Sequence, residues 1–213
     1  MINKLIKSIL AGVAISIGGT IYLLCTDKIV GALLFSVGIL MVMEFKLLLY
    51  TGYVPTQRES QNFIDYITNS SFVFVGNLIG GIITSGLLSL TNLKPKLLPA
   101  TIKACENKLG ADFLGDGILM NLLSVFILSI FCGIIIAAIV KATNLKHKVL
   151  YVAMMIATFI LCGFEHVVAN AFYFSFSLKL FTLEGLIFML LCFLGNFVGG
   201  YICSFVKSPE ENK

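Results

Sequence analysis

The chain alternates long stretches without charged residues and short polar connections. Four stretches carry no Asp, Glu, Lys or Arg: residues 9–26, 66–93, 117–140 and 185–206. Each is close to or longer than the roughly 20 residues that a helix needs to cross a bilayer. The sequence therefore predicts four complete membrane-spanning helices.

Two further apolar stretches, residues 29–57 and 149–178, are interrupted by polar residues. The interruptions are Glu44 and Lys46 in the first stretch and Glu165 and His166 in the second. Broken segments at corresponding places in two halves of a membrane protein are typical of midplane binding sites and pores. Irregular backbone at that depth is tolerated only inside protein or against water. We therefore expect two interrupted helices beside a pore.

One ten-residue sequence motif, the repeated phrase, occurs twice, at residues 74–83 and 193–202. The two copies share Phe, Gly, Asn, Gly, Gly and Ile at the same positions. Such internal similarity indicates two related halves. Each half has three spans, an odd number, so the halves must enter the membrane in opposite orientations. The sequence predicts one channel domain over residues 1–213, built as an inverted 3+3 repeat of about 1–93 and 108–207.

The repeated phrase contains small residues spaced by four and one asparagine. This spacing removes side chains from one helix face and lets another backbone approach closely. We expect the asparagines to form interhelical or backbone hydrogen bonds where the helices cross. The residues are Gly76, Asn77 and Gly80 in the first copy and Gly195, Asn196 and Gly199 in the second.

Composition supports an integral membrane protein. Hydrophobic residues make up 58% of the 213 residues and charged residues 12%, with a mean hydropathy of +0.99. The long runs fit helices rather than an outer-membrane barrel, whose strands show alternation over about ten residues. We expect no nucleic-acid partner because the lysines form no stripe. The six cysteines show no paired spacing, so we also expect no disulfide, metal or cofactor.

The charge bias favours cytoplasmic termini. Eight basic residues then face the cytoplasm and six face outward, in weak accord with the rule that positive residues stay inside. We expect a multi-pass protein of the inner (plasma) membrane. The eight are Lys4, Lys7, Arg58, Lys141, Lys146, Lys148, Lys207 and Lys213, and the six are Lys28, Lys94, Lys96, Lys103, Lys108 and Lys179.

The second interruption places an acid and an imidazole inside a membrane-embedded stretch, in the sequence Gly-Phe-Glu-His-Val-Val-Ala-Asn at 163–170. Ionisable residues are costly there, so a functional role is the default expectation, with a structural ion or hydrogen-bonded pair as the alternative. We expect both in part. Glu165 and Asn170 would fix the loop backbone, and His166 would face the pore.

This octapeptide, together with Gly-Asn-Phe-Val-Gly-Gly at 195–200, resembles the formate/nitrite transporter family of small monovalent-anion channels. The likeness extends to Phe-Ser-Val-Gly-Ile-Leu at 35–40 and Leu-Tyr-Thr-Gly at 49–52. The resemblance implies an aquaporin-like fold with six transmembrane helices, the second and fifth interrupted. It also implies a homopentamer whose pores each lie within one protomer.

The resemblance further assigns residues of the pore. It implies that the inner constriction is formed by Phe35, Ile39 and Phe159, and the outer one by Leu49 and Tyr50. Thr51 would supply a loop hydroxyl beside His166. The fourth span would contribute Asn121, and the lysine ahead of that span would be Lys108.

A mechanism follows from the cost of moving an anion past apolar rings. Cationic attraction lowers that cost, and conversion to the neutral acid removes it. An imidazole that titrates near neutrality suits either task. We expect the anion, which could be formate, nitrite or hydrosulfide, to meet His166 and Thr51 and to cross wholly or partly in protonated form. The partners would be this anion, protons and the lipid bilayer.

Two other classes of protein compete with an anion channel. An aquaporin-like channel for neutral solutes would need Asn-Pro-Ala or a close variant at both breaks, and neither break contains a proline. A membrane enzyme could use Glu165 and His166 for acid–base or metal chemistry. The sequence has no His-Glu-x-x-His, and a metal site needs three or four ligands. The identity of the anion, and channel against proton-coupled transport, stay open.

Overall fold

The computed structural model of this chain describes residues 1–142 and 147–206, and every regular element in these ranges is a helix. The helices are α1 (Ile2–Leu24), α2 (Lys28–Glu44), α3 (Tyr50–Gln57), α4 (Phe63–Ser89), α5 (Lys94–Leu109), α6 (Ile118–Lys141), α7 (Lys148–Leu161), α8 (Val167–Phe176), the short 3₁₀ helix η1 (Lys179–Phe181) and α9 (Leu183–Ser204). Three of the basic residues counted for the orientation, Lys146, Lys207 and Lys213, lie outside the described ranges.

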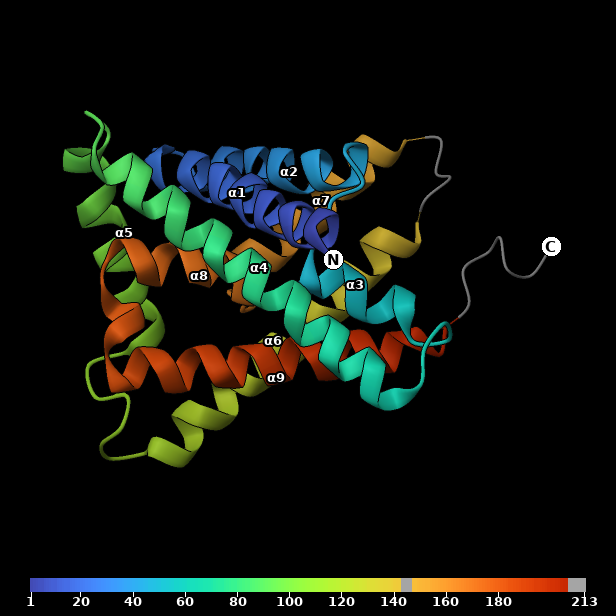
Figure 1. The fold of residues 1–213 in the computed structure, drawn as a ribbon. Helices are drawn as coiled ribbons and strands as arrows, with labels where there is room; N and C mark the ends of the chain where they lie inside the picture. Colours follow the sequence, from blue (N-terminus) through green and yellow to red (C-terminus); the bar gives the residue numbers. More distant parts are fainter. Residues whose placement is uncertain (143–146, 207–213) are drawn as a thin grey trace.

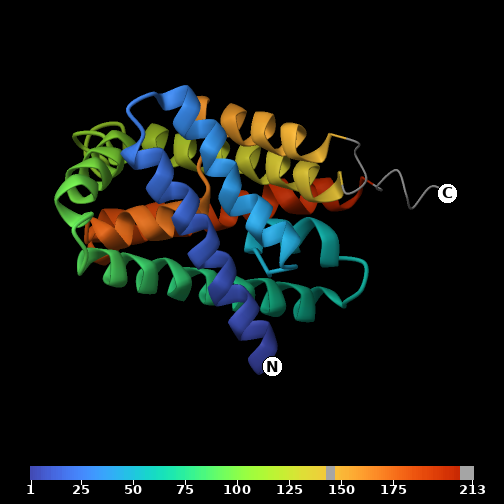
Figure 2. The same ribbon diagram turned by 90° about the horizontal axis from the view of Figure 1, so that it is seen from above.

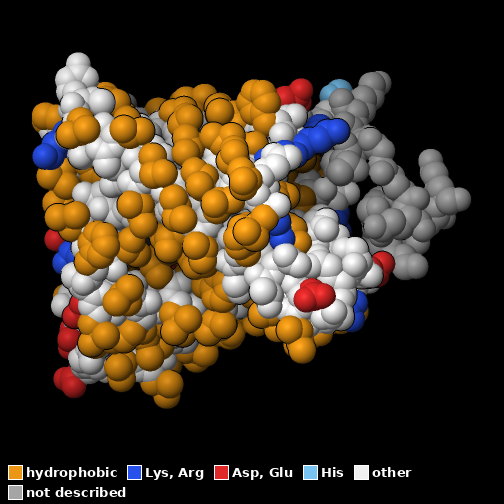
Figure 3. Space-filling model, viewed as in Figure 1, with side chains coloured by type: hydrophobic (Ala, Val, Ile, Leu, Met, Phe, Trp, Pro, Cys, Tyr) orange, Lys and Arg blue, Asp and Glu red, His pale blue; other side chains and the backbone are white. Residues whose placement is uncertain are grey.

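Within the described part of the chain, four helices are long and apolar enough to cross a membrane, namely α1, α4, α6 and α9. They coincide with the four charge-free runs, so this prediction is confirmed. Figure 3 shows hydrophobic side chains over most of one face, with charged side chains gathered toward its two ends. This distribution is that of an integral membrane protein.

The two interruptions lie where the sequence predicts them. Helix α2 ends at Glu44 and α3 begins at Tyr50, and helix α7 ends at Leu161 and α8 begins at Val167. The short helices α3 and α8 lie among the long helices in both views (Figures 1 and 2). The connecting segments are exposed where they begin, at Phe45 and Cys162, and buried where they end, at Leu49 and His166. The irregular backbone next to each short helix therefore meets protein, as buried irregular backbone requires.

Two helix pairs cross at close range, α1 with α4 and α6 with α9. Glycines make these crossings possible. A Cβ added to Gly80 would overlap the carbonyl oxygen of Ile9, and one added to Gly199 would overlap the carbonyl oxygen of Ile130. The Gly-x-x-x-Gly spacing thus brings backbones together, as predicted.

Helix α5 lies at the end of the molecule opposite α3 and is joined to α8 and α1 by contacts (Figure 1). Its first turn contains Pro95, which is tolerated there because the first N–H groups of a helix have no intrahelical partner. Gly110, with φ of 69°, ends the helix in a conformation that favours glycine. The helix brings Lys108 to the centre of the protein.

Candidate functional site

The first broken segment is held by the amide of Asn77, which is fully buried. Its Oδ1 accepts a hydrogen bond of 2.7 Å from the backbone N–H of Tyr50, the first residue of α3. Its Nδ2 donates to the carbonyls of Ser8 and Leu48 at 2.7 and 2.8 Å. One side chain therefore satisfies backbone groups on both sides of Leu49 that would otherwise be unpaired inside the protein.

The second broken segment is held in the same way by Asn196, also fully buried. Its Oδ1 accepts from the N–H of Val167 at 2.9 Å, and Val167 is the first residue of α8. Its Nδ2 donates to the carbonyls of Ser129 and Glu165 at 2.7 and 2.8 Å. The expected hydrogen bonds of both repeated asparagines are thus confirmed, and the residue between the two bonded positions is here His166.

His166 is 2% exposed and uses both ring nitrogens. Its Nδ1 accepts a hydrogen bond of 3.1 Å from the N–H of Ala169 and so caps the N-terminus of α8. Its Nε2 lies 3.0 Å from Oγ1 of Thr51. Because a backbone N–H can only donate, Nδ1 must be unprotonated and the ring hydrogen lies on Nε2, directed at the Thr51 hydroxyl. The protein therefore holds the imidazole neutral in this geometry.

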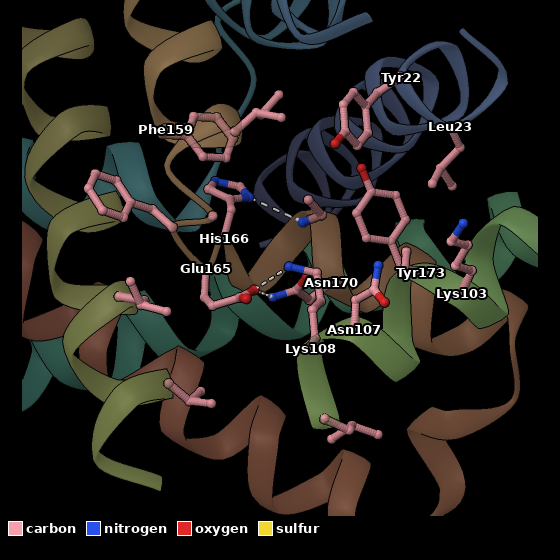
Figure 4. A pocket seen from close by; sticks show the side chains of 18 of the residues that line it. Tyr22, Leu23, Lys103, Asn107, Lys108, Phe159, Glu165, His166, Asn170 and Tyr173 are labelled. Carbon is pink, nitrogen blue, oxygen red and sulfur yellow. Dashed lines mark hydrogen bonds and ion pairs between the residues drawn. The ribbon is translucent and has the colours of Figure 1, made fainter. Parts of the chain in front are cut away.

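An ion pair lies beside His166. Nζ of Lys108 donates to Oε2 of Glu165 at 2.5 Å, and the two side chains are 20% and 7% exposed. The same carboxylate oxygen accepts from Nδ2 of Asn170 at 2.8 Å (Figure 4). Burial lowers the pKa of Lys108, but the attraction and the hydrogen bond to Glu165, with smaller contributions from neighbouring cysteines, together outweigh it and the pKa is raised. As an ion pair, the two side chains offset each other's charge locally.

Two phenylalanines form an apolar barrier next to the imidazole. The rings of Phe35 and Phe159 meet edge to face at 5.9 Å, and the ring of Phe159 lies 6.0 Å from that of His166. Both belong to the wall of a cavity of about 660 Å³ at the α5 end of the molecule, where His166 and Lys108 also line the wall (Figure 4). An anion entering from this end would therefore meet both rings and His166 in one space.

Leu49 lies at the opposite side of the site. It lines a second cavity, of about 250 Å³, together with Lys46 and Lys148. Predicted cytoplasmic termini would place Phe35 and Phe159 outward of His166 and Leu49 inward of it. With that orientation, Phe35 and Phe159 lie at the outer constriction and Leu49 at the inner one, which is the reverse of what the family resemblance implied. The reason is that α2 runs from the α5 end of the molecule toward the break, so Phe35 lies between the α5 end and the break.

The other predicted pore residues have different surroundings. Tyr50 stacks on Phe193 with ring centroids 4.9 Å apart, and its hydroxyl donates to the carbonyl of Phe193 at 3.0 Å, so its side chain joins α3 to α9. Ile39 is buried in the core. Asn121 lines the larger cavity, and its amide donates to the carbonyls of Asp112 and Phe113 at 3.1 and 3.2 Å.

Breaking the ion pair should destabilise the protein. In a Glu165→Gln variant, Lys108 would keep its charge without a carboxylate partner in a mostly buried place. Removing one partner of a buried pair costs about 3–5 kcal/mol, and less where one side chain is part exposed, so we expect a loss of about 1–3 kcal/mol. Thermal unfolding in detergent measures this loss.

The matched control is Glu106→Gln, which alters an exposed acid of α5, the helix that carries Lys108. It should leave the melting temperature unchanged, and the double variant Lys108→Met/Glu165→Gln should recover part of the loss. An unchanged melting temperature for Glu165→Gln would show that the pair adds nothing to stability.

A buried polar centre between apolar walls, within a bundle of membrane-spanning helices, defines a membrane transport protein rather than an enzyme. A family model described as "Formate/nitrite transporter" matches residues 1–207. The chain therefore belongs to the formate/nitrite transporter family, as the sequence resemblance indicated.

Solved structures support the fold. A "Pentameric formate channel with formate bound" superimposes with a TM-score of 0.75 at 23% identity, covering 94% of this chain and 92% of that one. An "FNT family ion channel" superimposes with a TM-score of 0.75 at 19% identity, covering 94% and 86%. No curated protein matches the sequence.

Several residues of the larger cavity were missed in the sequence. They are Tyr22 of α1, Lys28 of α2, Lys103 and Asn107 of α5, and Tyr173 of α8. The only sequence signal was the spacing along α5, where residues 100, 103, 104, 107 and 108 share one helix face. That signal is weak without knowing which face meets the protein.

Proposed function

We propose that this protein passes small monovalent anions, such as formate, nitrite or hydrosulfide, through a pore within each protomer. The observation that carries the proposal is the pairing of His166 with Thr51, 3.0 Å apart, between the phenylalanine pair and Leu49. Family membership supports the same substrate class. The pore has one polar centre with apolar walls on both sides.

The hydrogen bonds of His166 suggest how it acts on the anion. In the neutral ring, Nε2–H is the group that can turn from Thr51 and donate to the anion. Giving up this hydrogen would leave an imidazolate, so proton transfer to the anion needs the imidazolium form. That form requires a proton on Nδ1 and loss of the bond from the Ala169 N–H. In its neutral form, His166 therefore stabilises the charge of the anion by donating a hydrogen bond. Protonation of the anion by His166 would require the first turn of α8 to lose its cap.

The architecture we infer is a single domain of six membrane-crossing segments, related to aquaporins, with two inverted halves near residues 1–93 and 108–207. The matching bonds of Asn77 and Asn196 support the repeat, because each joins equivalent positions of its own half. The likeness in fold to a pentameric formate channel supports a homopentamer. We place the protein in the inner membrane, surrounded by lipid, with both termini cytoplasmic.

The direct test is a flux panel with protein reconstituted in liposomes. Formate, nitrite and hydrosulfide are each offered at pH 5.5 and pH 7.5, with water and glycerol permeability measured by light scattering. Anion flux above empty liposomes is expected. Water or glycerol flux without anion flux would favour the neutral-solute channel instead.

Replacing His166 by asparagine should abolish the pH dependence of formate flux and lower the flux about tenfold or more. Asparagine is among the best N-cap residues and can still accept from the Ala169 N–H, so α8 keeps its start. It offers no titratable group, and a hydrogen bond to a charged group is worth about 1.5–3 kcal/mol. Formate efflux from liposomes at several pH values measures both effects.

The control is His147→Asn, because His147 is exposed, lies at the start of α7 and lines neither cavity. It should conduct like the unmodified protein. If His166→Asn kept both the flux and its pH profile, His166 would have no part in permeation.

A further inference from the structure

The wall of the larger cavity has an unequal charge balance. Three lysines line it, Lys28, Lys103 and Lys108, and Glu165 is the one acid among the described residues of the wall. Glu165 already pairs with Lys108. Attraction of an anion into the cavity must therefore come from Lys28 and Lys103, for which the described residues provide no ion pair.

Helix α5 presents polar donors to the cavity on one face. Lys103 and Asn107 are four residues apart, and Lys108 follows on the same face, while Ala100 and Ala104 keep the space between them open. Neither Lys103 nor Asn107 side chain makes a hydrogen bond within the described part of the protein. These side chains can therefore bind a ligand without first breaking a hydrogen bond within the protein.

Tyr173 of α8 faces the same space. The residue is 5% exposed, and its hydroxyl makes no hydrogen bond among residues 1–142 and 147–206. In those residues Ser70 Oγ is the one buried side-chain polar atom without a partner, so the Tyr173 hydroxyl is open to the cavity rather than buried. Figure 4 shows the hydroxyl ends of Tyr173 and Tyr22 pointing toward one another in the cavity, with Asn107 and Lys103 alongside. Gly19 makes room for this ring, since a Cβ there would lie 2.9 Å from its Cε1 atom.

We propose that Lys103, Asn107 and Tyr173 form a second anion site, in the outer part of the cavity before the Phe35–Phe159 pair. The inference rests on the proposed function and adds a place where the anion waits, still charged and partly hydrated. The Lys103 amine and the Asn107 amide lie beside the Tyr173 ring, and the phenol O–H enters the same cavity from a second helix (Figure 4), so an anion with two acceptor oxygens finds several donors in one space. The ligand class is therefore a small carboxylate or a nitrite-like oxyanion, held more tightly than hydrosulfide.

The test measures formate currents across planar bilayers as a function of formate concentration, added from each side separately. Lys103→Gln should raise the half-saturating concentration from the α5 side about fivefold at low ionic strength, because one unit charge at contact distance in water is worth about 1 kcal/mol. The shift should disappear at about 1 M of an impermeant salt, which screens charges beyond about 3 Å. From the other side, no shift is expected.

Tyr173→Phe should raise the half-saturating concentration from the α5 side about threefold at both ionic strengths, because a hydrogen bond is lost and no charge is removed. Lys96→Gln is the matched control, since Lys96 is an exposed lysine of α5 outside the cavity wall. It should behave like the unmodified protein.

The outcomes separate the two proposals. An unmodified protein that carries no formate current would contradict the proposed function itself. A conducting protein in which Lys103→Gln and Tyr173→Phe both match Lys96→Gln would overturn the second site alone. A salt-sensitive effect of Lys103→Gln without any effect of Tyr173→Phe would also overturn it, because diffuse attraction would then suffice.

Discussion

A Gly199→Leu variant is expected to fail to assemble. A Cβ at position 199 would overlap the carbonyl oxygen of Ile130 and lie 3.0 Å from both the carbonyl carbon of Ile130 and the backbone nitrogen of Ile134. These are backbone atoms of α6, which cannot move without separating α6 from α9. Size-exclusion chromatography in detergent should show loss of the native oligomer, and liposomes should show no anion flux.

The control for this variant is Gly86→Leu. Gly86 also lies in a membrane-spanning helix, α4, but a Cβ there would meet no atom within 4 Å. This protein should assemble and conduct normally. An assembled and conducting Gly199→Leu protein would show that the α6–α9 crossing tolerates a wider spacing than the structure has.

Asn196→Leu is expected to cause a comparable loss. The substitution leaves the buried N–H of Val167 unpaired and removes one bond each from the carbonyls of Ser129 and Glu165, of which Glu165 keeps a contact with the Cys192 thiol. An unpaired buried group costs about 1–3 kcal/mol, and the two weakened carbonyls add to this, so the loss is large relative to the stability of most proteins. Chemical unfolding in detergent should show a strongly reduced midpoint, and formate flux should fall because His166 is no longer held in place.

Two further variants serve as a parallel test and a control for Asn196→Leu. Asn77→Leu should reduce the unfolding midpoint by a similar amount, because Asn77 makes the same three kinds of bond at the first break. Asn92→Leu replaces an exposed asparagine between α4 and α5 and should have no effect. Equal midpoints for Asn196→Leu and Asn92→Leu would mean that the broken segment is held by packing alone.

The membrane-spanning part of this fold could be predicted closely from the sequence. The run at 66–93 became α4 (Phe63–Ser89), and the polar pair Glu165–His166 marked the true start of α8 at Val167. The reason is physical: in hydrocarbon each charged residue is costly and each backbone group needs a partner, so the pattern of charges tightly constrains the helices.

The distant contacts could not be predicted in this way. Lys108 and Glu165 are 57 residues apart, and their meeting depends on how α5 folds back toward the centre. The sequence around Lys108 is polar and gives no sign of its partner. The position of Phe35 relative to the break could not be predicted for the same reason, because it depends on the direction of α2 in the folded protein and not on the composition of that helix.

The asparagine bonds at the two breaks reach only main-chain atoms, and the side chains of Leu49 and His166 take no part in them. The asparagine bonds therefore do not depend on which side chain stands at either place, whereas the start of α8 also depends on the cap that the His166 side chain supplies. After duplication of an ancestral half, one copy could acquire an imidazole that caps its short helix, while the other kept an aliphatic group, without any change in the asparagine bonds. Positions 49 and 166 are thus a pair of sites at which a designer could exchange the chemistry of the pore, as long as the residue at position 166 can still cap α8.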